Sequence, residues 1–452
     1  MNLPLPSMEE NAVQLVQALQ DAGHIAYFAG GCVRDQLRGV SPKDYDIATS
    51  ATPDQVLEIF PRSDSIGAHF GVILVKQKGH AYEIATFRED GAYSDGRRPD
   101  EVRFSDPEND AKRRDFTVNG MFFDPVAEQL IDFVGGREDL ATGTLRAIGE
   151  PRLRFEEDYL RMLRAIRFAT VLDYEIESET WNSLREEAPS IQQISPERIR
   201  EELDRIWLHP NRIRGFDLLV ASGLMQEILP EILDLQGVEQ PPQWHPEGDV
   251  FVHTRLMLSL LPDEVSLPLV LSVLFHDIGK PATFMMDEKE NRIRFNGHDK
   301  VGAEMAESIL HRLRYSNAVI DATVSGVANH MRFIDVKQMR TSTLKRFMDR
   351  PEFPDEMELH RVDCLGSNGN LSNYEFLEAK KEEFAAEPLV PPPLVTGRDL
   401  IDRKLKPSPE FKTILQCAQD LQLEGELKTR EEALAWLDNA LSEKRADSGD
   451  SS

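Results

Sequence analysis

One stretch near the N-terminus, residues 25–46, constrains this chain more than any other part of its sequence. The β-rich run 25–28 leads into Gly30 and Gly31, Arg34 follows, and we expect a helix from Asp35. Glycine lets the backbone approach a ligand closely, and amides that turn from a strand into a helix form a cradle for phosphate. A Gly-Gly pair alone is more often an ordinary turn. A phosphate site therefore needs a second indication.

Asp44 and Asp46 supply that indication. In an extended segment, side chains two residues apart point to the same face, so the two carboxylates are expected to lie together. Two like charges at close range are costly unless a cation lies between them, and Mg²⁺ binds carboxylates together with substrate phosphates. A solvated Asp-x-Asp turn is the alternative for the pair alone. With the glycines, the pair predicts a Mg²⁺-dependent nucleotidyl-transfer site with Asp44 and Asp46 as its catalytic ligands.

Length and composition set the class of protein. A chain of 452 residues has room for two to four domains, and a hydrophobic content of 40% with 29% charged residues is typical of a soluble globular protein. The sequence contains no apolar run of 18 residues and no basic-then-apolar leader, so we expect a cytoplasmic protein without a membrane partner. Three scattered cysteines predict neither a disulfide framework nor a zinc cluster.

The formal net charge of −27 argues against a uniformly basic surface that binds nucleic acid. Basic and acidic residues nearly balance between Arg97 and Arg167, so the excess of acid lies elsewhere. Binding of RNA by such a chain is expected to be weak and sensitive to salt.

A second motif is Arg113-Arg114-Asp115, which precedes an apolar stretch. Asp115 could be only a helix N-cap. The functional interpretation gives the two guanidinium groups to nucleotide phosphates, because the arginine fork matches phosphate oxygens. Asp115 would then accept a hydrogen bond from a ribose hydroxyl.

A third motif lies in the helical run 155–168. Glu157 and Asp158 precede Arg161 by four and three residues, so all three can meet on one helix face. A salt-bridged surface face is the simpler interpretation. The alternative is base selection: a carboxylate beside a guanidinium matches the amino donor and ring-nitrogen acceptor of cytosine and adenine and opposes guanine and uracil. A good bidentate pair discriminates by about 1–3 kcal/mol.

A fourth group of residues recurs in the helical region that follows. A lone helical histidine is usually a core or surface residue, but this region also has an adjacent His-Asp pair, and imidazole with carboxylate suits Mn²⁺, Ni²⁺ or Co²⁺. The group consists of His253, His276, Asp277, His298, His330 and Asp363.

Together these motifs resemble the class II nucleotidyltransferases of the polymerase β superfamily, that is, the bacterial-type CCA-adding tRNA nucleotidyltransferases and poly(A) polymerases. The resemblance runs over most of the chain. It implies an α+β fold with an N-terminal polymerase-β-like palm, a mixed sheet with helices, followed by all-α parts. The expected domains are the nucleotidyltransferase head at 1–148, a helical neck and body that binds RNA and nucleotide at 149–240, an α-helical HD domain at 241–386, and a helical C-terminal module with a disordered tail (after Glu443) at 387–452.

The resemblance also implies roles for individual residues. Asp158 and Arg161 match a Glu-Asp-x-x-Arg motif that acts as a protein template. His253, His276, Asp277 and Asp363 match the metal ligands of HD phosphohydrolases, and His298 and His330 match positions that bind phosphate or a second metal. The nucleotide-binding residues implied are Gly30, Gly31, Arg34, Arg113, Arg114, Asp115, Glu157, Asp158, Arg161, Arg164 and Arg167.

The function implied is addition or repair of the 3′-terminal CCA of tRNA from CTP and ATP, with Mg²⁺ in the palm. A second, metal-dependent phosphohydrolase activity in the HD domain would use Ni²⁺, Mn²⁺ or Co²⁺. The segment 67–71 looks like the CCA-adding version of its region, and the loop 89–99 resembles the flexible loop that enzymes adding only cytidines lack. Glu83 is a candidate third carboxylate, although we expect it to pair with an arginine.

Three alternatives stay open. A poly(A) polymerase would keep the same palm, and an A-only enzyme would work beside a separate C-adding partner. From another class, the HD phosphohydrolase could be the main activity, with the palm reduced to RNA binding. The oligomeric state cannot be predicted from the sequence.

Overall fold

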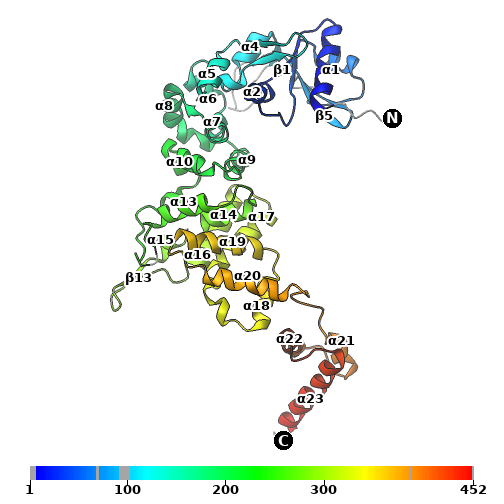
Figure 1. Ribbon diagram of the computed structural model, residues 1–452, viewed down its shortest axis with the longest axis vertical. Coiled ribbons are helices and arrows are strands. Elements are labelled where there is room, and N and C mark those ends of the chain that lie inside the picture. Colours follow the sequence, from blue (N-terminus) through cyan, green and yellow to red (C-terminus); the bar gives the residue numbers. More distant parts are fainter. Residues whose placement is uncertain (1–6, 68–70, 91–101, 244, 387, 450–452) are drawn as a thin grey trace. The chain divides into compact units, whose positions relative to one another are not determined.

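The computed structural model describes residues 7–67, 71–90, 102–243, 245–386 and 388–449. The chain divides into unit 1, Met1–Leu233 with Arg312–Tyr315, and unit 2, Asp234–His311 with Ser316–Ser452. Figure 1 shows a sheet with its helices at the N-terminal end of the chain and helices through most of the remainder. Residues 68–70 of the predicted CCA-type segment and residues 91–99 of the predicted loop lie outside the described residues.

A mixed sheet forms the centre of the N-terminal part of unit 1. Among the described residues it has seven strands in the order β3-β4-β5-β2-β1-β8-β9, and within it only β2 and β5 pair in parallel. This arrangement confirms the predicted mixed sheet. The strands are β1 Ala26–Ala29, β2 Ile47–Thr49, β3 Ser63–Gly67, β4 Val72–Gln77, β5 His80–Thr86, β8 Phe122–Asp124 and β9 Gln129–Ile131; β6 Arg88–Asp90 and β7 Val102–Phe104 pair separately.

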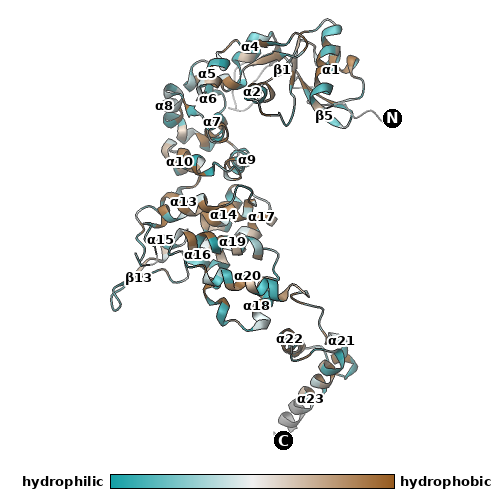
Figure 2. Ribbon diagram, in the orientation of Figure 1, coloured by the Kyte–Doolittle hydropathy of each residue, from teal (hydrophilic) through white to brown (hydrophobic). Residues whose placement is uncertain are grey.

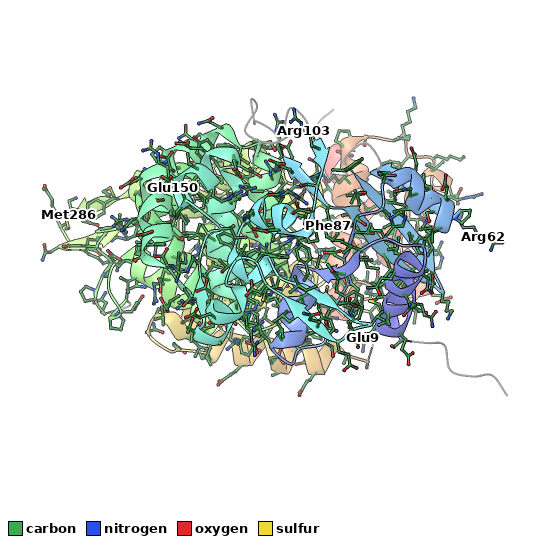
Figure 3. The ribbon with its side chains drawn as sticks, turned by 90° about the horizontal axis from the view of Figure 1, so that it is seen from above. Glu9, Arg62, Phe87, Arg103, Glu150 and Met286 are labelled. Atoms are coloured by element: carbon green, nitrogen blue, oxygen red, sulfur yellow. The ribbon has the colours of Figure 1, made fainter. Side chains whose placement is uncertain are left out.

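Helices and a hydrophobic core support this sheet. Helix α1, Met8–Asp21, begins at a capping box formed by Ser7 and Glu10, and its predicted apolar face is buried. A separate hydrophobic cluster contains Phe87, which is fully buried (Figure 3) and packs edge-on against Phe122. The other helices of this part are α2 Gly31–Leu37, α3 Pro53–Ile59, α4 Pro107–Lys112, η2 Thr117–Asn119 and α5 Gly136–Thr142.

Helix α2 begins four residues earlier than predicted. The sequence places its start at Asp35, but the helix begins at Gly31. Gly30 adopts a φ of 70°, and this conformation turns the chain directly from β1 into the helix. Arg34 therefore lies within the helix.

The remainder of unit 1 is almost entirely helical, but the run 155–168 is not one helix as predicted. Helix α6 ends at Glu157 and α7 begins at Leu160, because Asp158 has an extended backbone with φ −156°. The elements are β10 Thr144–Leu145, α6 Pro151–Glu157, α7 Leu160–Leu172, β11 Glu175–Ile176, α8 Ser178–Glu187, η3 Ala188–Gln193, α9 Pro196–Trp207, α10 Arg212–Ser222, α11 Leu224–Ile228 and α12 Pro230–Leu233.

Unit 2 is built around α14, Leu267–Phe275, which Figure 2 shows as hydrophobic along its length. Residues 269–275 of this helix are all buried, so the side chains that follow it enter the unit's interior. The other elements are α13 Val250–Leu260, α15 Lys280–Thr283, β12 Met285–Asp287, β13 Arg292–Arg294, α16 His298–Arg312, α17 Asn317–Asn329, η4 His330–Gln338, α18 Thr341–Met348, α19 Phe353–Gly366 and α20 Ser372–Phe384.

The C-terminal part of unit 2 consists of α21 Gly397–Asp402, α22 Pro409–Glu424 and α23 Arg430–Gly449, which share a hydrophobic core of their own. The tail predicted to be disordered after Glu443 continues α23 as far as Gly449. Its Glu, Lys, Arg and Ala residues favour helix, which explains the difference. Within the described part of the chain, no helix combines the length and apolarity needed to cross a membrane.

Candidate active site and candidate metal centre

The two predicted catalytic carboxylates lie at the entrance to β2. Asp44 and Asp46 flank the buried Tyr45 in the segment just before the strand, and both are on its exposed side. The predicted alternation therefore holds, although neither residue is inside the strand. Loss of hydration raises the pKa of Asp46 to about 6, the charges of Asp44 and Glu83 also raise it, and Arg114 lowers it.

Glu83 lies beside these carboxylates. Strands β2 and β5 are parallel with Ile47 opposite Ile84, so the preceding residues, Asp46 and Glu83, are neighbours across the two strands. In the described ranges no arginine forms a hydrogen bond or ion pair with Glu83, contrary to the partner expected from the sequence. Carboxylates that act on one another in this way offer the oxygen donors that a divalent cation such as Mg²⁺ binds.

Arg34 and Gly30 form one wall of the adjoining pocket. The Arg34 guanidinium is nearly buried, donates to Asn119 Oδ1 at 2.7 Å and pairs with Asp35 at 2.8 Å. A Cβ atom on Gly30 would lie 3.0 Å from Nη1 of Arg114. Glycine is thus required both by the turn and by the close approach of Arg114.

Asp110 holds both arginines of the Arg-Arg-Asp motif. Its buried carboxylate accepts from Arg113 Nε at 2.8 Å and from Arg114 Nη2 at 3.0 Å. Burial alone would raise the pKa of Asp110, but the two guanidinium groups lower it. The two fixed cations lie at the pocket wall, where they are suited to bind phosphate.

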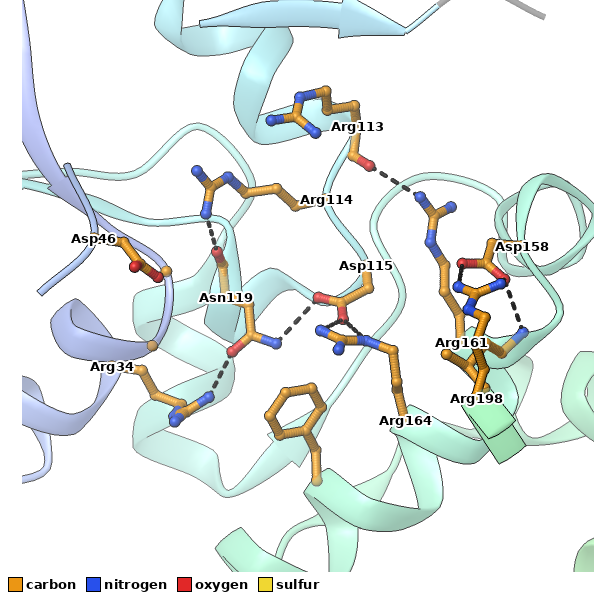
Figure 4. Close-up of a pocket in the computed structure, with 14 residues that line it drawn as sticks. Arg34, Asp46, Arg113, Arg114, Asp115, Asn119, Asp158, Arg161, Arg164 and Arg198 are labelled. Atoms are coloured by element: carbon orange, nitrogen blue, oxygen red, sulfur yellow. Dashed lines mark hydrogen bonds and ion pairs between the residues drawn. The ribbon is translucent and has the colours of Figure 1, made fainter. Parts of the chain in front are cut away.

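Asp115 links the sheet-bearing part of unit 1 to α7. Its Oδ1 accepts from the backbone of Phe116 at 2.8 Å and from Asn119 at 3.0 Å. Its Oδ2 accepts from Arg164 Nε at 2.8 Å and lies 2.6 Å from Nη2 of the same guanidinium. Figure 4 shows the resulting chain of hydrogen bonds from Arg34 through Asn119 and Asp115 to Arg164. A carboxylate has about four acceptor positions, so a ribose hydroxyl would have to displace one of these donors.

The predicted template residues are each held by another partner. Asp158 accepts two hydrogen bonds from Arg198, at 3.2 and 2.6 Å, and does not meet Arg161 on one helix face as predicted. Arg161 pairs with Glu157, as in the simpler salt-bridge interpretation, and also donates to the carbonyl of Arg113 at 3.3 Å. Both side chains nevertheless line the pocket (Figure 4).

One pocket of about 490 Å³ collects most of the predicted nucleotide site. Nine of the eleven predicted nucleotide-binding residues line it, together with Asp46. Glu157 and Arg167 do not, and Arg167 instead pairs with buried Glu202 at 2.5 Å. Asp44 also lies outside the lining.

The predicted metal ligands of unit 2 converge from separate helices. His253 comes from α13, Asp363 from α19 and His298 from α16, while His330 follows α17. The pair His276-Asp277 follows α14 directly, which explains its burial. His253 Nε2 lies 3.2 Å from Asp363 Oδ1, and His276 Nε2 lies 3.1 Å from Asp277 Oδ2.

The tautomers of these histidines follow from their hydrogen bonds. The Nδ1 atoms of His276, His298 and His330 lie 2.9, 2.7 and 2.6 Å from the backbone carbonyls of the residues three positions earlier. Because a carbonyl only accepts, each Nδ1 carries a proton, and in the neutral ring the lone pair available to a metal is then on Nε2. The Nε2 atoms of His298 and His330 are 3.1 Å apart.

Facing lone pairs at that distance repel one another unless a cation lies between or beside them. Burial, together with the proximity of His276, lowers the pKa of His330 to about 4, so the ring is neutral, as a metal ligand must be. The Asp277 carboxylate lies between two of these histidines in its contacts: Oδ1 is 3.4 Å from His298 Nε2, and Oδ2 is 3.1 Å from His276 Nε2. The donor set of imidazole and carboxylate fits a divalent transition metal.

Comparison with known proteins identifies the parts of the chain. Three family models match it: the "Poly A polymerase head domain" at residues 26–146, the "Probable RNA and SrmB- binding site of polymerase A" at 173–235, and the "HD domain" at 252–363. The CCA-adding enzyme of Limosilactobacillus reuteri (strain DSM 20016) is 38% identical over 265 residues. That alignment covers 58% of this chain and 65% of the relative.

In these segments the chain is similar to the tRNA nucleotidyltransferase/poly(A) polymerase family. The CCA-adding enzyme of Geobacillus stearothermophilus is 42% identical over 216 residues, 48% of this chain and 53% of that protein. The chain thus matches between about half and two thirds of the length of these curated relatives. The matching family models and the observed sheet confirm the predicted α+β fold with an HD domain.

Solved structures of CCA-adding enzymes match nearly the whole chain. The crystal structure of the Bacillus stearothermophilus CCA-adding enzyme in complex with CTP matches 98% of this chain and 100% of its own, with a TM-score of 0.75 and 25% identity. The Thermotoga maritima CCA-adding enzyme complexed with tRNA_CCA matches 96% of both chains with a TM-score of 0.59 at 18% identity, which shows a shared fold.

Four residues that line the pocket were not predicted to bind nucleotide: Asn119, Leu160, Phe168 and Arg198. Asp110 was also missed, although it had a usable signal, because it precedes the two arginines by three and four residues. Arg198 lies in the sequence Ser-Pro-Glu-Arg at 195–198, which resembles a further element of the family, but its pairing with Asp158, 40 positions earlier, was not predicted.

The buried pairing of Asp115 predicts how stability depends on pH. Burial raises the pKa of Asp115, but Arg164 and Asn119 lower it to about 2. Because the folded value is below the unfolded value, the stabilisation is fully present above about pH 4 and is lost as pH falls toward 2. Asp115→Asn should lower the free energy of unfolding by about 2 kcal/mol at pH 7 and by about half as much at pH 3, measured by urea unfolding. A difference between the two proteins that stays constant with pH would contradict this account.

Proposed function

We propose that this protein adds or repairs the 3′-terminal CCA sequence of tRNA from CTP and ATP. The observation that carries the proposal is the single pocket that joins Asp46 to six arginines and to the predicted template pair. Solved relatives of the same fold are described as CCA-adding enzymes in complex with CTP, ATP or tRNA_CCA. In this proposal residues 1–148 are the head, 149–240 the neck and body, 241–386 the HD domain, and 387–452 the C-terminal module.

The palm would hold Mg²⁺ on Asp44 and Asp46, with Glu83 as a third oxygen donor. A bound metal of this kind lowers the pKa of the attacking 3′-hydroxyl and neutralises charge on the pyrophosphate leaving group. The chain's own residues bind and orient the nucleotide. Arg113 and Arg114, held by Asp110, would take the triphosphate, since rigid guanidinium forks match phosphate oxygens.

Base selection would fall to Asp158 and Arg161. The Asp158 carboxylate would accept from the exocyclic amino group of cytosine or adenine, and Arg161 would donate to the adjacent ring nitrogen. Arg198 fixes the plane of the Asp158 carboxylate, and Glu157 restrains Arg161. A side chain that is already held loses little conformational entropy when it binds a base, which strengthens the discrimination.

Replacing Asp46 or Asp44 with alanine should abolish nucleotide addition and change tRNA affinity by less than about threefold. The metal ligands lower the barrier of the chemical step, whereas RNA is bound mainly by other surfaces. Addition is measured with labelled CTP and ATP on tRNA that lacks its 3′ end, and affinity by filter binding. Asp54→Ala, on the exposed first turn of α3, is the matched control. Turnover above about a tenth of wild type in the Asp46 variant would rule out the palm assignment.

Arg161→Ala should relax the choice of base, so that UTP or GTP is incorporated at a rate about tenfold closer to that of CTP. The reason is loss of the donor to the ring nitrogen. Competition between labelled triphosphates measures the ratio. Arg152→Ala, which removes an exposed ion pair on the neighbouring α6, is the control. A variant that loses stability but keeps its selectivity would support a purely structural Glu157–Arg161 pair.

The same substrates separate the alternatives within the family. Incubation of unprocessed tRNA with each labelled triphosphate alone distinguishes three outcomes. Addition of cytidines from CTP, followed by one adenosine from ATP, is the result expected here. Addition of adenosine only to tRNA that already ends in CC would indicate an A-only enzyme, and long adenosine tracts would indicate a poly(A) polymerase.

The buried histidine cluster supports a second activity for unit 2. We propose that it is a metal-dependent phosphohydrolase site with His253, His276, Asp277 and Asp363 as ligands. His298 and His330 would bind phosphate or a second metal. Imidazole ligands favour later transition metals such as Ni²⁺, Co²⁺ or Mn²⁺ over Mg²⁺.

The double variant His276→Ala, Asp277→Ala should lose Ni²⁺- or Mn²⁺-dependent hydrolysis of 2′,3′-cyclic nucleotides or phosphomonoesters. It should still complete CCA ends in Mg²⁺, because the cluster and the palm lie in different units. Both activities are measured on the same preparation, with folding checked by circular dichroism. Loss of CTP and ATP addition in the folded variant would show that the sites are coupled. Absence of hydrolysis by the wild-type protein with any divalent metal would leave the cluster a structural role.

A further inference from the structure

His253 differs from the other histidines of the metal centre in what its Nδ1 atom contacts. His276, His298 and His330 each place Nδ1 against a backbone carbonyl of their own turn. His253 Nδ1 instead lies 2.7 Å from Oε1 of Glu247, with the carbonyl of Gly366 farther away at 3.3 Å. One histidine of this centre therefore has a carboxylate as its partner.

Glu247 is itself well enclosed. Its side chain is only 8% exposed, and the same Oε1 atom also lies 2.9 Å from Nδ1 of His245. The other oxygen, Oε2, is buried and makes no hydrogen bond with any residue in the described ranges. Burial of a carboxylate costs free energy unless hydrogen bonds or an opposite charge offset the lost hydration. In Glu247 only Oε1 has such contacts, with His245 and His253.

Two roles are geometrically open to Glu247. His245, Glu247 and His253 bring their ligand atoms within 4.8 Å of one another, which is compatible with a separate metal site. However, His253 Nε2 faces the main cluster, 3.2 Å from Asp363 Oδ1. A neutral imidazole has one lone pair, so His253 cannot serve a metal through each nitrogen. If Nε2 is a metal ligand of the main cluster, Nδ1 carries the proton and donates a hydrogen bond to Oε1 of Glu247.

We propose that Glu247 is a positioning residue of the HD metal centre. Its carboxylate holds His253 in the tautomer with the proton on Nδ1, orients the ring, and increases the basicity of Nε2 toward the metal. The inference rests on the metal-dependent function proposed for this cluster. It assigns a role to a residue outside the segment 252–363 that matches the HD family model.

The stretch before α13 also contacts a second proposed ligand of the cluster. Gln240 Oε1 accepts from Lys280 Nζ at 2.6 Å, and the same ammonium group lies 2.6 Å from Asp277 Oδ2. Gln240 and Lys280 are both buried, so this chain of contacts is shielded from water. Residues 240 and 247 therefore connect to two different proposed ligands, Asp277 and His253.

The test measures metal binding by the full-length protein, with Co²⁺ as the probe. Wild type, Glu247→Gln and Glu247→Leu are titrated by calorimetry, and the Co²⁺ absorption spectrum is recorded. Leucine fills the space but cannot accept a hydrogen bond from His253, so the Kd of the Glu247→Leu variant for Co²⁺ should rise about 10–100-fold. Glutamine still accepts through its amide oxygen but carries no charge, so its Kd should rise only about threefold. Glu290→Gln, on the exposed β12–β13 turn, is the control and should bind as wild type does.

The two variants also separate positioning from simple packing. A ligand held by Glu247 predicts an altered Co²⁺ spectrum for leucine and near recovery for glutamine, whereas a packing role predicts wild-type spectra for any variant that folds. If Glu247→Leu does not fold, the small loss in Glu247→Gln decides the question. A wild-type Kd for Co²⁺ in Glu247→Gln would then overturn the proposal. Failure of the wild-type protein to bind Co²⁺ would overturn the proposed metal site itself.

Discussion

The ion pair between Asp115 and Arg164 is the interaction on which the nucleotide pocket depends. Asp115 follows the two arginines held by Asp110, and Arg164 projects from α7, so this pair fastens the sheet-bearing part of unit 1 to its helical part. Asp115 is buried, accepts hydrogen bonds from Phe116, Asn119 and Arg164, and carries the charge that pairs with the Arg164 guanidinium, so a neutral residue here would leave that guanidinium without its nearest counter-charge. Arg34 and Arg161 line the same cavity.

Electrostatics also organises unit 2, where the converging groups would attract a cation and not an anion. Three buried histidines, His276, His298 and His330, donate from Nδ1 to backbone carbonyls. Their Nε2 atoms point toward one another or toward Asp277. In unit 1 a surplus of guanidinium groups faces a space suited to phosphate, whereas in unit 2 converging lone pairs face a space suited to a cation. In both places the protein presents charges or dipoles that a bound ligand of opposite charge, a phosphate in unit 1 or a cation in unit 2, would stabilise.

Periodicity and local motifs predicted much of this from the sequence. The apolar face of α1 lies where its periodicity predicts, and the mixed sheet agrees with the family resemblance. Nine of the eleven residues that the resemblance suggests for nucleotide binding line one pocket, and their role stays a prediction. The failures have physical causes. Gly30 starts α2 early, Asp158 interrupts the predicted helix at 158–159, and Glu83 has no arginine partner among the described residues. Each of these depends on a backbone conformation or a strand register that composition does not reveal.

The sequence by itself determined which chemistry is present: two aspartates near a glycine turn, an Arg-Arg-Asp motif, a carboxylate near an arginine, and a set of histidines with an adjacent aspartate. These signals are local, so residue type and spacing are enough to find them. Only the tertiary structure decided which partner each group has. Arg198 reaches Asp158, Glu83 lies beside Asp46 through strand pairing, and Glu247 contacts His253. Contacts between segments distant in sequence are set by packing of the folded chain, and no local pattern encodes them.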